Sequence, residues 1–281
     1  MNSNDLTTFL AVYETGSFSR AAERLHLTQP AISKRIDALE RDLGNRLFDR
    51  VGKRVYLTGA GNLLEPRARA LLSAMDDTRI LLLNLNTSVD GRLQMTTSHH
   101  IGLHRLGPIL KAYTRAFPDV ELDINFEDSE AAHHMVAHAE TELAVVTLDP
   151  AAGDHPGLDY LTLWHDPLCF VVASDHQLAS KGTVLLEDLA GCPAVIPGTQ
   201  TYTGRIILQT FRDRGLNLHS TMSTNYLETL GMLVEAGLGW SVLPSSMVTG
   251  SLKVLDTDAP EISRTLGCVT NPSRTLSNAA S

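Results

Sequence analysis

The apolar residues of the first 25 positions recur every three or four residues, which is the spacing of helices with one buried face. A first run through residues 6–13 stops at Gly16, a residue suited to the left-handed conformation that ends helices. A second run through residues 18–25 includes small alanines and can be capped by Ser17 or Ser19. The pattern predicts two short helices, the second of which lets another helix approach closely.

A third helix is predicted after a very short turn. Thr28 can accept hydrogen bonds from its first free backbone N–H groups, and Pro30 stands in the first turn, where a missing N–H costs little. The apolar residues of this helix share one face, at Ile32, Ile36, Leu39 and Leu43. Helix, short turn and second helix with a polar N-terminal edge form a helix-turn-helix, whose second helix enters the major groove of DNA. An ordinary helical pair is the alternative.

The polar edge of the third helix carries groups that suit DNA bases. Gln29 can present a donor and an acceptor to adenine, and Ser33 can serve in either role. Lys34 or Arg35 can reach guanine or phosphate. These residue types in this order favour DNA recognition over a merely solvated surface.

A basic-tipped hairpin is predicted from residues 46–58, where two short apolar segments surround a turn at Gly52. The tip carries Arg50, Lys53 and Arg54. Such a wing can bind phosphates or enter a narrow minor groove beside the recognition helix. The wing therefore argues against the ordinary helical pair.

The N-terminal sequence closely resembles the winged helix-turn-helix of LysR-type transcriptional regulators. The resemblance is carried by FLAVYETGSFSRAAERLHLTQPAISKRIDALERDLGNRLFDR and by the following LTGAG. It implies an all-α winged helix-turn-helix DNA-binding domain over residues 1–58. In that family the positions matching Gln29, Pro30, Ser33 and Lys34 face the bases, and those matching Arg50, Lys53 and Arg54 face the backbone or minor groove. The predicted DNA-binding residues are these seven together with Thr28 and Arg35.

One long helix is predicted from Gly61 to Val89, because no turn signal precedes Asp90-Gly91. Its apolar stripe alternates steps of four and three, the rhythm of a coiled coil. Such a stripe can pack onto its own domain, but resemblance to the LysR linker helix favours dimerisation and a linker over residues 59–90. The predicted contacts are Leu64, Ala68, Leu71, Met75, Leu82 and Leu85. A homo-oligomer, dimer or tetramer, would then present two recognition helices to an interrupted inverted repeat.

Beyond Gly91, apolar segments alternate with helical ones, which is the pattern of an α/β fold with a largely parallel sheet. Two such rounds resemble the LysR effector domain, which has a periplasmic-binding-protein-like fold of two lobes. The domain is expected to span residues 91–281. Lobe I would comprise about 91–160 and 263–281, and lobe II about 161–262. The closing TLSNAAS resembles the beginning of a final helix, which suggests a truncated chain.

Ligands of open α/β sheets lie at the carboxyl ends of strands, where the next helix points its N–H groups into a cleft. That rule selects Ser98, His99, His100, Thr147, Thr199, Gln200, Thr201, Thr203 and Asn225. Hydroxyls, amides and N–H groups suit a small carboxylate or inorganic oxyanion, and a protonated histidine would add charge. Alternatively, the hydroxyls merely cap helices.

The net charge of −9 is unevenly distributed along the 281 residues. Residues 1–90 carry 12 Lys+Arg and 11 Asp+Glu, whereas the rest carry 11 and 21. The acidity therefore belongs to the second part and does not argue against DNA binding by the first.

Cysteines and histidines give no sign of a disulfide, a metal or a cofactor. Cys169, Cys192 and Cys268 are widely separated, which predicts buried free thiols. His134 and His138 stand at i and i+4 without a third ligand nearby, so a solvent-facing pair is favoured over a metal site.

Enzyme classes are not indicated. There is no G-x-S-x-G elbow and no P-loop, so no catalytic residues are predicted. The N-terminus lacks the pattern of a secretory signal and no run is long enough to span a bilayer, which predicts a cytoplasmic protein without a membrane partner.

The sequence thus predicts a LysR-type transcription regulator, activator or repressor, modulated by a small anionic effector bound between two lobes. RNA polymerase is a further partner that the resemblance implies. The alternatives are a solute-binding protein without a DNA role and, less favoured, an enzyme.

Overall fold

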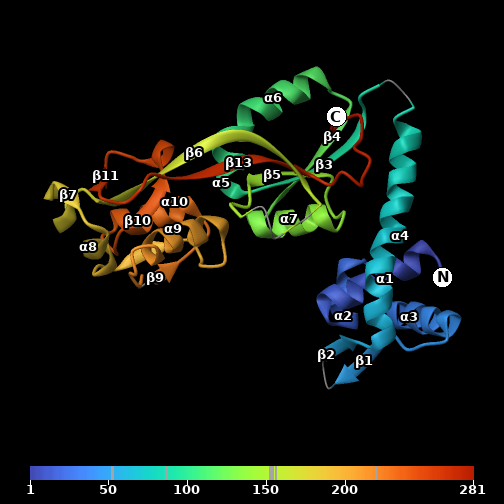
Figure 1. The fold of residues 1–281 in the computed structure, drawn as a ribbon. Helices are drawn as coiled ribbons and strands as arrows, with labels where there is room; N and C mark the ends of the chain where they lie inside the picture. Colours follow the sequence, from blue (N-terminus) through green and yellow to red (C-terminus); the bar gives the residue numbers. More distant parts are fainter. Residues whose placement is uncertain (52–53, 86–87, 152–154, 156, 219) are drawn as a thin grey trace. The chain divides into compact units, whose positions relative to one another are not determined.

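The computed structural model describes residues 1–51, 54–85, 88–151, 155, 157–218 and 220–281, with the backbone alone at residues 50, 51 and 54 (Figure 1). The chain divides into two compact units, Met1–Thr87 and Ser88–Ser281. Within the described residues, no helix combines the length and apolarity needed to cross a membrane.

The first unit is a winged helix-turn-helix followed by a long helix. Its elements are α1 (Ser3–Thr15), α2 (Phe18–Arg24), α3 (Gln29–Leu43), β1 (Phe48–Val51), β2 (Arg54–Leu57) and α4 (Gly59–Leu83). The caps are those that the sequence predicted. Gly16 ends α1 with φ 60°, and the side chains of Ser17 and Thr28 accept hydrogen bonds at the N-termini of α2 and α3. This order and these caps confirm the predicted three helices and wing.

The core of this unit is formed by residues close in sequence. The buried face of α3 packs with α1 and α2 through Phe9, Ala21, Ile32, Ile36 and Leu39. Where α4 begins, a Cβ on Gly61 would lie 2.3 Å from the Leu47 carbonyl oxygen, so only glycine allows this close approach. Local packing of this kind is what the hydrophobic pattern predicts well.

The linker helix is shorter than predicted. Helix α4 ends at Leu83 with Asn84 as its C-cap, six residues before the predicted end at Val89. The sequence alone gave no turn signal between these points. Leu85, a predicted dimer contact, therefore lies beyond the helix.

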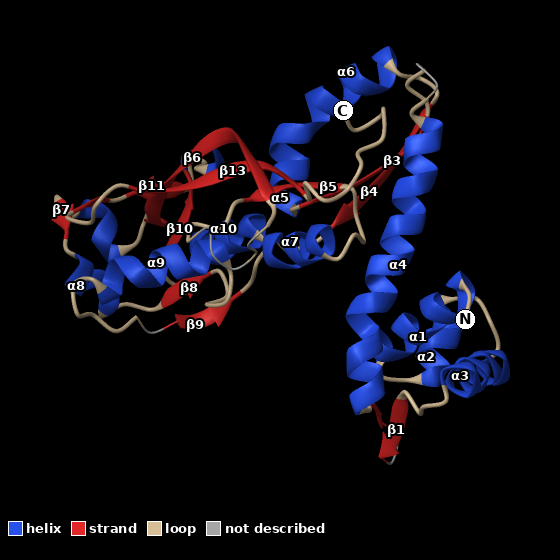
Figure 2. Cartoon of the chain, turned by 45° about the vertical axis from the view of Figure 1, so that its right-hand side comes forward, coloured by secondary structure: helices blue, strands red, loops and turns tan. Residues whose placement is uncertain are grey.

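The second unit contains two lobes joined by long strands (Figures 1 and 2). Lobe I contains β3 (Gly91–Thr97), α5 (His99–Ile101), a π-helical turn (Gly102–Leu106), α6 (Gly107–Ala116), β4 (Val120–Phe126), α7 (Ser129–Ala137) and β5 (Leu143–Thr147). Figure 2 shows α6 and α7 on opposite faces of its sheet. Lobe II contains a 3-10 turn (Gln177–Ser180), β7 (Thr183–Val184), α8 (Leu186–Ala190), β8 (Ala194–Ile196), α9 (Tyr202–Arg212), β9 (Ser220–Ser223), α10 (Leu227–Glu235), β10 (Ser241–Pro244), a second 3-10 turn (Ser245–Met247), β11 (Leu252–Val254) and β12 (Asp256–Thr257).

Two long strands, β6 (Asp159–Ala173) and β13 (Ile262–Thr270), run between the lobes and pair antiparallel with each other. The main sheet has the order β10-β6-β13-β5-β3-β4, with β11 beside β6. The prediction of a largely parallel sheet is wrong for this sheet. Only β3–β4 and β3–β5 pair parallel in it, because β13 returns to lobe I and lies antiparallel to β5.

Lobe II has the larger apolar core. Trp240 is fully buried, stacks against Phe211 with ring centroids 5.5 Å apart, and donates from Nε1 to the Leu189 carbonyl at 2.8 Å. The hydrogen bond offsets the cost of removing the indole N–H from water. It holds the helices α9 and α10, whose N-termini face lobe I.

Candidate effector site and nucleic-acid interface

The N-terminal edge of α3 presents the predicted base-reading residues to solvent. Gln29, Pro30 and Lys34 are exposed, and the Gln29 amide donates to the Ser33 hydroxyl at 2.9 Å. This hydrogen bond holds two predicted readers in one orientation before any DNA arrives. Thr28 is exposed as well, but its hydroxyl serves as the N-cap of α3.

Arg35 points differently from the other predicted DNA-binding residues. Its Nη1 lies 3.4 Å from the Thr8 hydroxyl of α1, and Thr8 is buried. Arg35 is half-buried, so it braces α3 against α1 rather than projecting freely. The sequence did not distinguish these two roles.

The predicted wing is a two-stranded antiparallel hairpin. Val51 pairs with Arg54, and Arg50 pairs with Val55 next to the tip. Lys53 lies outside the described residues, as do the side chains of Arg50 and Arg54. The hairpin is therefore present, and its cationic contacts to DNA stay a prediction.

The predicted dimer contacts of α4 divide into two groups. Ala68 is fully buried in the core of its own unit, and Leu64 is partly buried against that core. Ala68 is therefore wrong as a dimer contact, because no second chain can reach its side chain. Leu71, Met75 and Leu82 are exposed and remain available on α4. Leu85 is also exposed but follows the end of the helix.

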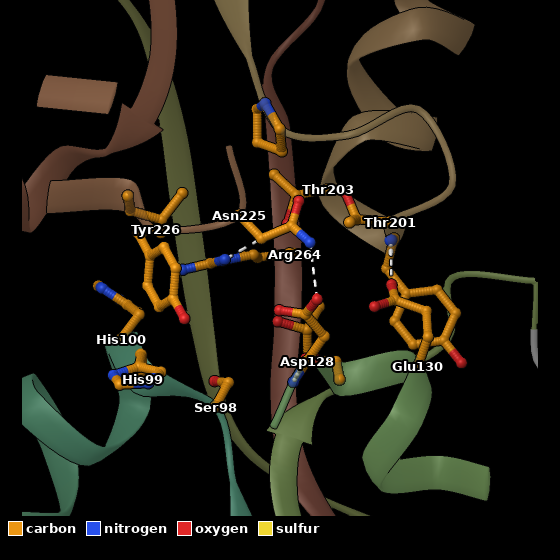
Figure 3. A pocket seen from close by; sticks show the side chains of 15 residues that line it. Ser98, His99, His100, Asp128, Glu130, Thr201, Thr203, Asn225, Tyr226 and Arg264 are labelled. Carbon is orange, nitrogen blue, oxygen red and sulfur yellow. Dashed lines mark hydrogen bonds between the residues drawn. The ribbon is translucent and has the colours of Figure 1, made fainter. Parts of the chain in front are cut away.

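A cavity of about 60 Å³ lies between the two lobes (Figure 3). Seven predicted effector residues line it: Ser98, His99, His100, Thr147, Thr201, Thr203 and Asn225. Thr199 and Gln200 are exposed and lie outside the lining. The lining also includes residues that the sequence did not select: Asp128, Ser129, Glu130, Pro197, Tyr202, Tyr226, Leu227 and Arg264. Strand ends thus predicted much of the wall but none of its charged side chains.

Several hydroxyls at the cavity are already engaged within the protein. The Thr201 hydroxyl accepts from the Gly204 N–H at 3.0 Å and donates to the Gly198 carbonyl at 2.7 Å, so it caps α9. The Thr203 hydroxyl accepts from Nη1 of Arg264 at 3.3 Å. For Thr201, helix capping is therefore the observed role. The Ser98 hydroxyl, by contrast, makes no capping hydrogen bond at α5.

Polar side chains bridge the two lobes across the cavity. The carboxylate of Glu130, on α7 of lobe I, accepts from the backbone N–H of Tyr202 at the N-terminus of α9. Nδ2 of Asn225 in lobe II donates to Asp128 Oδ2 at 2.7 Å, and its Oδ1 accepts from the Gly198 N–H at 3.2 Å. Figure 3 shows Asp128 and Glu130 pointing toward lobe II. These hydrogen bonds connect the two lobes across the cavity.

A buried ion pair lies where the crossing strands meet. Arg264 of β13 is 6 % exposed and stands directly opposite Asp166 of β6, which is 1 % exposed. Arg264 donates from Nε to Asp166 Oδ2 at 2.8 Å, and Arg105 of lobe I places Nη2 3.4 Å from Oδ1. Burial lowers the pKa of Arg264, while Asp166 opposes that shift. The charge nevertheless persists at neutral pH because arginine ordinarily titrates above 12.

The two histidines after β3 have different surroundings. His100 is 5 % exposed, and burial together with the positive charge of Arg264 lowers its pKa to about 4, against the opposing effect of Asp166. His100 is therefore neutral at neutral pH and does not supply the positive charge that the sequence allowed for. His99 is exposed, and its ring contacts Phe126 of lobe I and Tyr226 of lobe II.

The charge of the cavity wall is acidic. Arg264 is paired with Asp166, and the other carboxylates of the lining are those of Asp128 and Glu130. Burial, and also the negative charge of Asp128, raises the pKa of Glu130, whereas backbone N–H donors and Arg205 lower it. A wall of this kind favours cationic or hydrogen-bond-donating groups over anions.

A second, larger cavity of about 390 Å³ shares Arg264 with the first. Its other lining residues are Leu148, Asp149, Pro150, Tyr160, Ile206, Ser263 and Thr265. Arg264 therefore lines both cavities, so a change in its ion pair with Asp166 would alter the walls of both.

Potential metal-binding side chains lie in two places in the second unit. His134 and His138 stack with ring centroids 3.8 Å apart on α7, and His134 is exposed, in agreement with a solvent-facing pair. Within the described ranges, the group of potential metal ligands that gathers three side chains is His100, His104 and Glu228. The three cysteines are free, as predicted, but each is only partly buried.

The residues that the sequence missed carry two different signals. Arg264 and Asp166 are single charges inside strand segments with apolar residues, a pattern that indicates a buried pair. Asp128 and Glu130 lie just after strand β4, and Thr147 ends β5, so the strand-end rule applies to them as well.

Known proteins are similar to this chain over its whole length. Residues 3–62 match the family described as bacterial regulatory helix-turn-helix protein, lysR family, and residues 86–281 match the LysR substrate binding domain. An uncharacterized HTH-type transcriptional regulator in the ibpB-leuC intergenic region of Azotobacter vinelandii is 63% identical over 108 residues, 38% of this chain and 75% of that protein. A probable RuBisCO transcriptional regulator of Trichormus variabilis is 28% identical over 96% of this chain and 82% of its own length.

Solved structures show the same fold. Full-length OxyR from Pseudomonas aeruginosa, as a point variant, has a TM-score of 0.67 and 23% identity, covering 98% of this chain and 90% of that one. Full-length CbnR in complex with its target DNA has a TM-score of 0.61 and 20% identity, covering 98% and 95%. The matched families consist of transcription regulators rather than enzymes.

Proposed function

Because the chain belongs to the LysR family of transcriptional regulators, we propose that a small effector bound between its two lobes controls how it acts on DNA. The observation that carries this proposal is the pair of hydrogen-bonded bridges across the cavity, Glu130 to Tyr202 and Asn225 to Asp128. An effector that enters here must contact or break these bridges. It therefore binds the open and closed arrangements unequally, which is the requirement for control by a ligand.

The DNA-binding role rests on the exposed edge of α3. Gln29 and Lys34 are exposed there, and Gln29 is held by Ser33. CbnR, which shares this fold, has been solved in complex with its target DNA, and this supports a DNA-binding role. We propose that Gln29, Ser33 and Lys34 contact the bases and that the wing contacts the phosphates. An oligomer would bind an interrupted inverted repeat through two such domains.

The chemistry of the effector follows from the wall of the cavity. The anionic effector predicted from the sequence requires a positive site, yet Glu130 already occupies the N–H group at the start of α9 and Arg264 is neutralised by Asp166. Two carboxylates, Asp128 and Glu130, face the space instead. We favour a small effector that carries an amine or several hydrogen-bond donors.

The size of the effector is limited in this arrangement. A cavity of about 60 Å³ has room for a few water-sized groups, since one water needs about 10–15 Å³ of such space. A larger effector requires the lobes to part, which breaks the bridges at Glu130 and Asp128. The response of the protein to effector size therefore reports on lobe opening.

Thermal shift of the full chain tests both effector chemistries. Acetate, sulfate and phosphate are compared with ethylenediamine and agmatine at equal ionic strength, since a ligand that binds the native lobes raises the melting temperature. Amines should raise it, and Glu130→Gln should reduce the effect. Glu127→Gln is the matched control, because Glu127 is an exposed neighbour outside the lining.

Two outcomes contradict this proposal in distinct ways. Stabilisation by the oxyanions, strengthened in Glu130→Gln, would restore the anionic effector. Stabilisation by any of the five probes without a change in DNA binding in a gel shift would separate the cavity from regulation and favour a solute-binding role.

A further inference from the structure

Three potential metal ligands from both lobes converge beside the cavity. His100 and His104 stand one helical turn apart, in α5 and the π-helical turn that continues it, and Glu228 lies in the first turn of α10. His104 Nε2 is 2.9 Å from Glu228 Oε1, and His100 Nδ1 is 4.0 Å from the same oxygen. One ligand atom from each residue fits within a span of 4.8 Å.

His100 is a buried side chain without hydrogen bonds. It is only 5 % exposed, and within the described part of the chain neither ring nitrogen has a hydrogen-bond partner. A buried polar group without a hydrogen-bond partner destabilises the protein, so these ring nitrogens point to a ligand that supplies the missing partner. Nδ1 of this ring faces Glu228, the only carboxylate of the three-residue group.

We propose that His100, His104 and Glu228 form a binding site for a divalent transition-metal ion, with Zn²⁺ as the best fit, that joins the two lobes. Two histidines at i and i+4 on a helix are a recurrent zinc-binding pair. Two imidazoles and one carboxylate complete a three-residue ligand set that leaves a fourth position for water or another small molecule. Mg²⁺ and Ca²⁺ prefer oxygen ligands and fit this set poorly.

The distances need only small side-chain movements. Ligand atoms ~2.0–2.1 Å from a tetrahedral zinc ion lie ~3.3 Å from each other. The His104–Glu228 separation of 2.9 Å and the His100–Glu228 separation of 4.0 Å bracket that value. His104 and Glu228 are 43 % and 37 % exposed, so solvent ions have access and both side chains can adjust.

The second ring nitrogen of His100 faces a carboxylate, as is usual for a histidine that binds a metal. When Nδ1 faces Glu228, Nε2 faces Asp166 Oδ2 at 3.9 Å. A carboxylate behind a ligating imidazole fixes its tautomer and orientation. Arg105 and Arg264 surround the same carboxylate and oppose the charge of the ion. Asp166 and Glu228 offset these two positive charges, so the site is electrically neutral before the ion binds.

This inference departs from the sequence prediction of no metal site, and it does not depend on the proposed effector. The stretch HHIGLHR contains the histidine pair, but its carboxylate partner is 124 residues away in the sequence. The sequence drew attention to His134 and His138 instead. That pair supplies a built-in comparison, because it has the same i and i+4 spacing on another helix.

Calorimetric titration of the full chain with ZnCl₂, after removal of bound metal with EDTA, tests the site. We expect one ion per chain, with affinity lowered at least about tenfold in His104→Gln and in Glu228→Gln, since losing a ligand costs no less than losing an outer partner. His138→Gln should bind as the wild type does. Zinc should also raise the melting temperature of the wild type and of His138→Gln but not of the two site variants.

Cobalt spectroscopy identifies the ligand type, because Co²⁺ bound by nitrogen and oxygen lacks the thiolate charge-transfer band that cysteine ligation would add. Circular dichroism without metal establishes that each variant is folded, as expected for partly exposed positions. The proposal is overturned if the wild type binds no zinc, if both site variants bind it unchanged, if His138→Gln abolishes binding, or if the thiolate band appears.

Discussion

The two units of this regulator place their functional side chains in opposite ways. In the first, Gln29 and Lys34 lie on the surface of α3, and the main core cluster consists of apolar side chains. In the second, Arg264 and Asp166 are buried where strands from distant parts of the sequence meet. These exposed side chains can contact DNA without any rearrangement of the core. Buried charges instead make the stability of the unit depend on how its lobes are arranged.

The buried ion pair should have the largest effect. Arg264→Met removes the closer guanidinium partner of the buried Asp166 and leaves Arg105 at 3.4 Å, so the second unit is expected to lose up to ~3–5 kcal/mol of stability. Urea denaturation followed by tryptophan fluorescence, which reports on Trp164 and Trp240 of the second unit, measures this loss. The first unit should remain folded, because its core contains none of these residues.

The matched control replaces both partners of the pair. Because a buried ion pair is often no better than apolar side chains of similar volume, Arg264→Met with Asp166→Leu should recover most of the stability. If the double variant is as unstable as the single one, the hydrogen bond from Arg264 to Thr203 matters more than the uncompensated charge.

The exposed stripe on α4 should have the next largest effect, on self-association. Leu71, Met75 and Leu82 are exposed in the single chain, and burying such side chains between two chains stabilises by about 1.5–3 kcal/mol each. Met75→Asp should therefore weaken a dimer by at least about tenfold in sedimentation equilibrium. Leu63→Gln is the control, because Leu63 is 69 % exposed on the same helix but off the stripe. Equal weakening by both substitutions would rule out this stripe as the interface.

Gln29 tests base reading in the first unit. Gln29→Ala should cost about 1–3 kcal/mol on the operator and loosen base preference, because the lost amide contacts are specific to one base. Gel shifts on operator and random DNA measure both quantities. An equal loss of affinity on the two DNAs would show that Gln29 contributes no base selection.

Arg54 provides the contrasting case, on strand β2 of the wing. Arg54→Ala should weaken binding to all sequences alike and lower the slope of log affinity against log salt by about one, as expected for one lost phosphate contact. A salt series of gel shifts measures the slope. An unchanged slope would place Arg54 away from the phosphates.

The same contrast explains what the sequence could predict. Helix caps at Ser17 and Thr28 and the apolar face of α3 are local, so their pattern alone located them. The register of Arg264 opposite Asp166 is set by strands 98 residues apart, and no local pattern carries such a pairing. Strand ends located Thr147 and Asn225 at the cavity, but the charge of the wall depends on which side chains are already paired. This pairing of side chains depends on the three-dimensional fold and not on the local sequence.

Glu130 should have the smallest effect, and its direction with pH is informative. Burial raises its pKa, so folding favours the protonated carboxyl, and its contribution to stability declines as the pH rises from the ordinary carboxyl pKa through the raised value. Glu130→Gln stays neutral and can still accept the Tyr202 N–H. The two proteins should therefore match at low pH, and the variant should be more stable at neutral pH.

The difference should stay below about 1 kcal/mol, because Glu130 is only half-buried and solvent screens it. Urea denaturation across a pH series measures it, with Glu127→Gln as the exposed control. A variant less stable than the wild type at neutral pH would mean that the charged hydrogen bond to α9 outweighs the burial of the carboxylate. The hydrogen bond from the Tyr202 N–H to Glu130 would then stabilise the contact between the lobes. An effector that separates the lobes would have to replace this hydrogen bond.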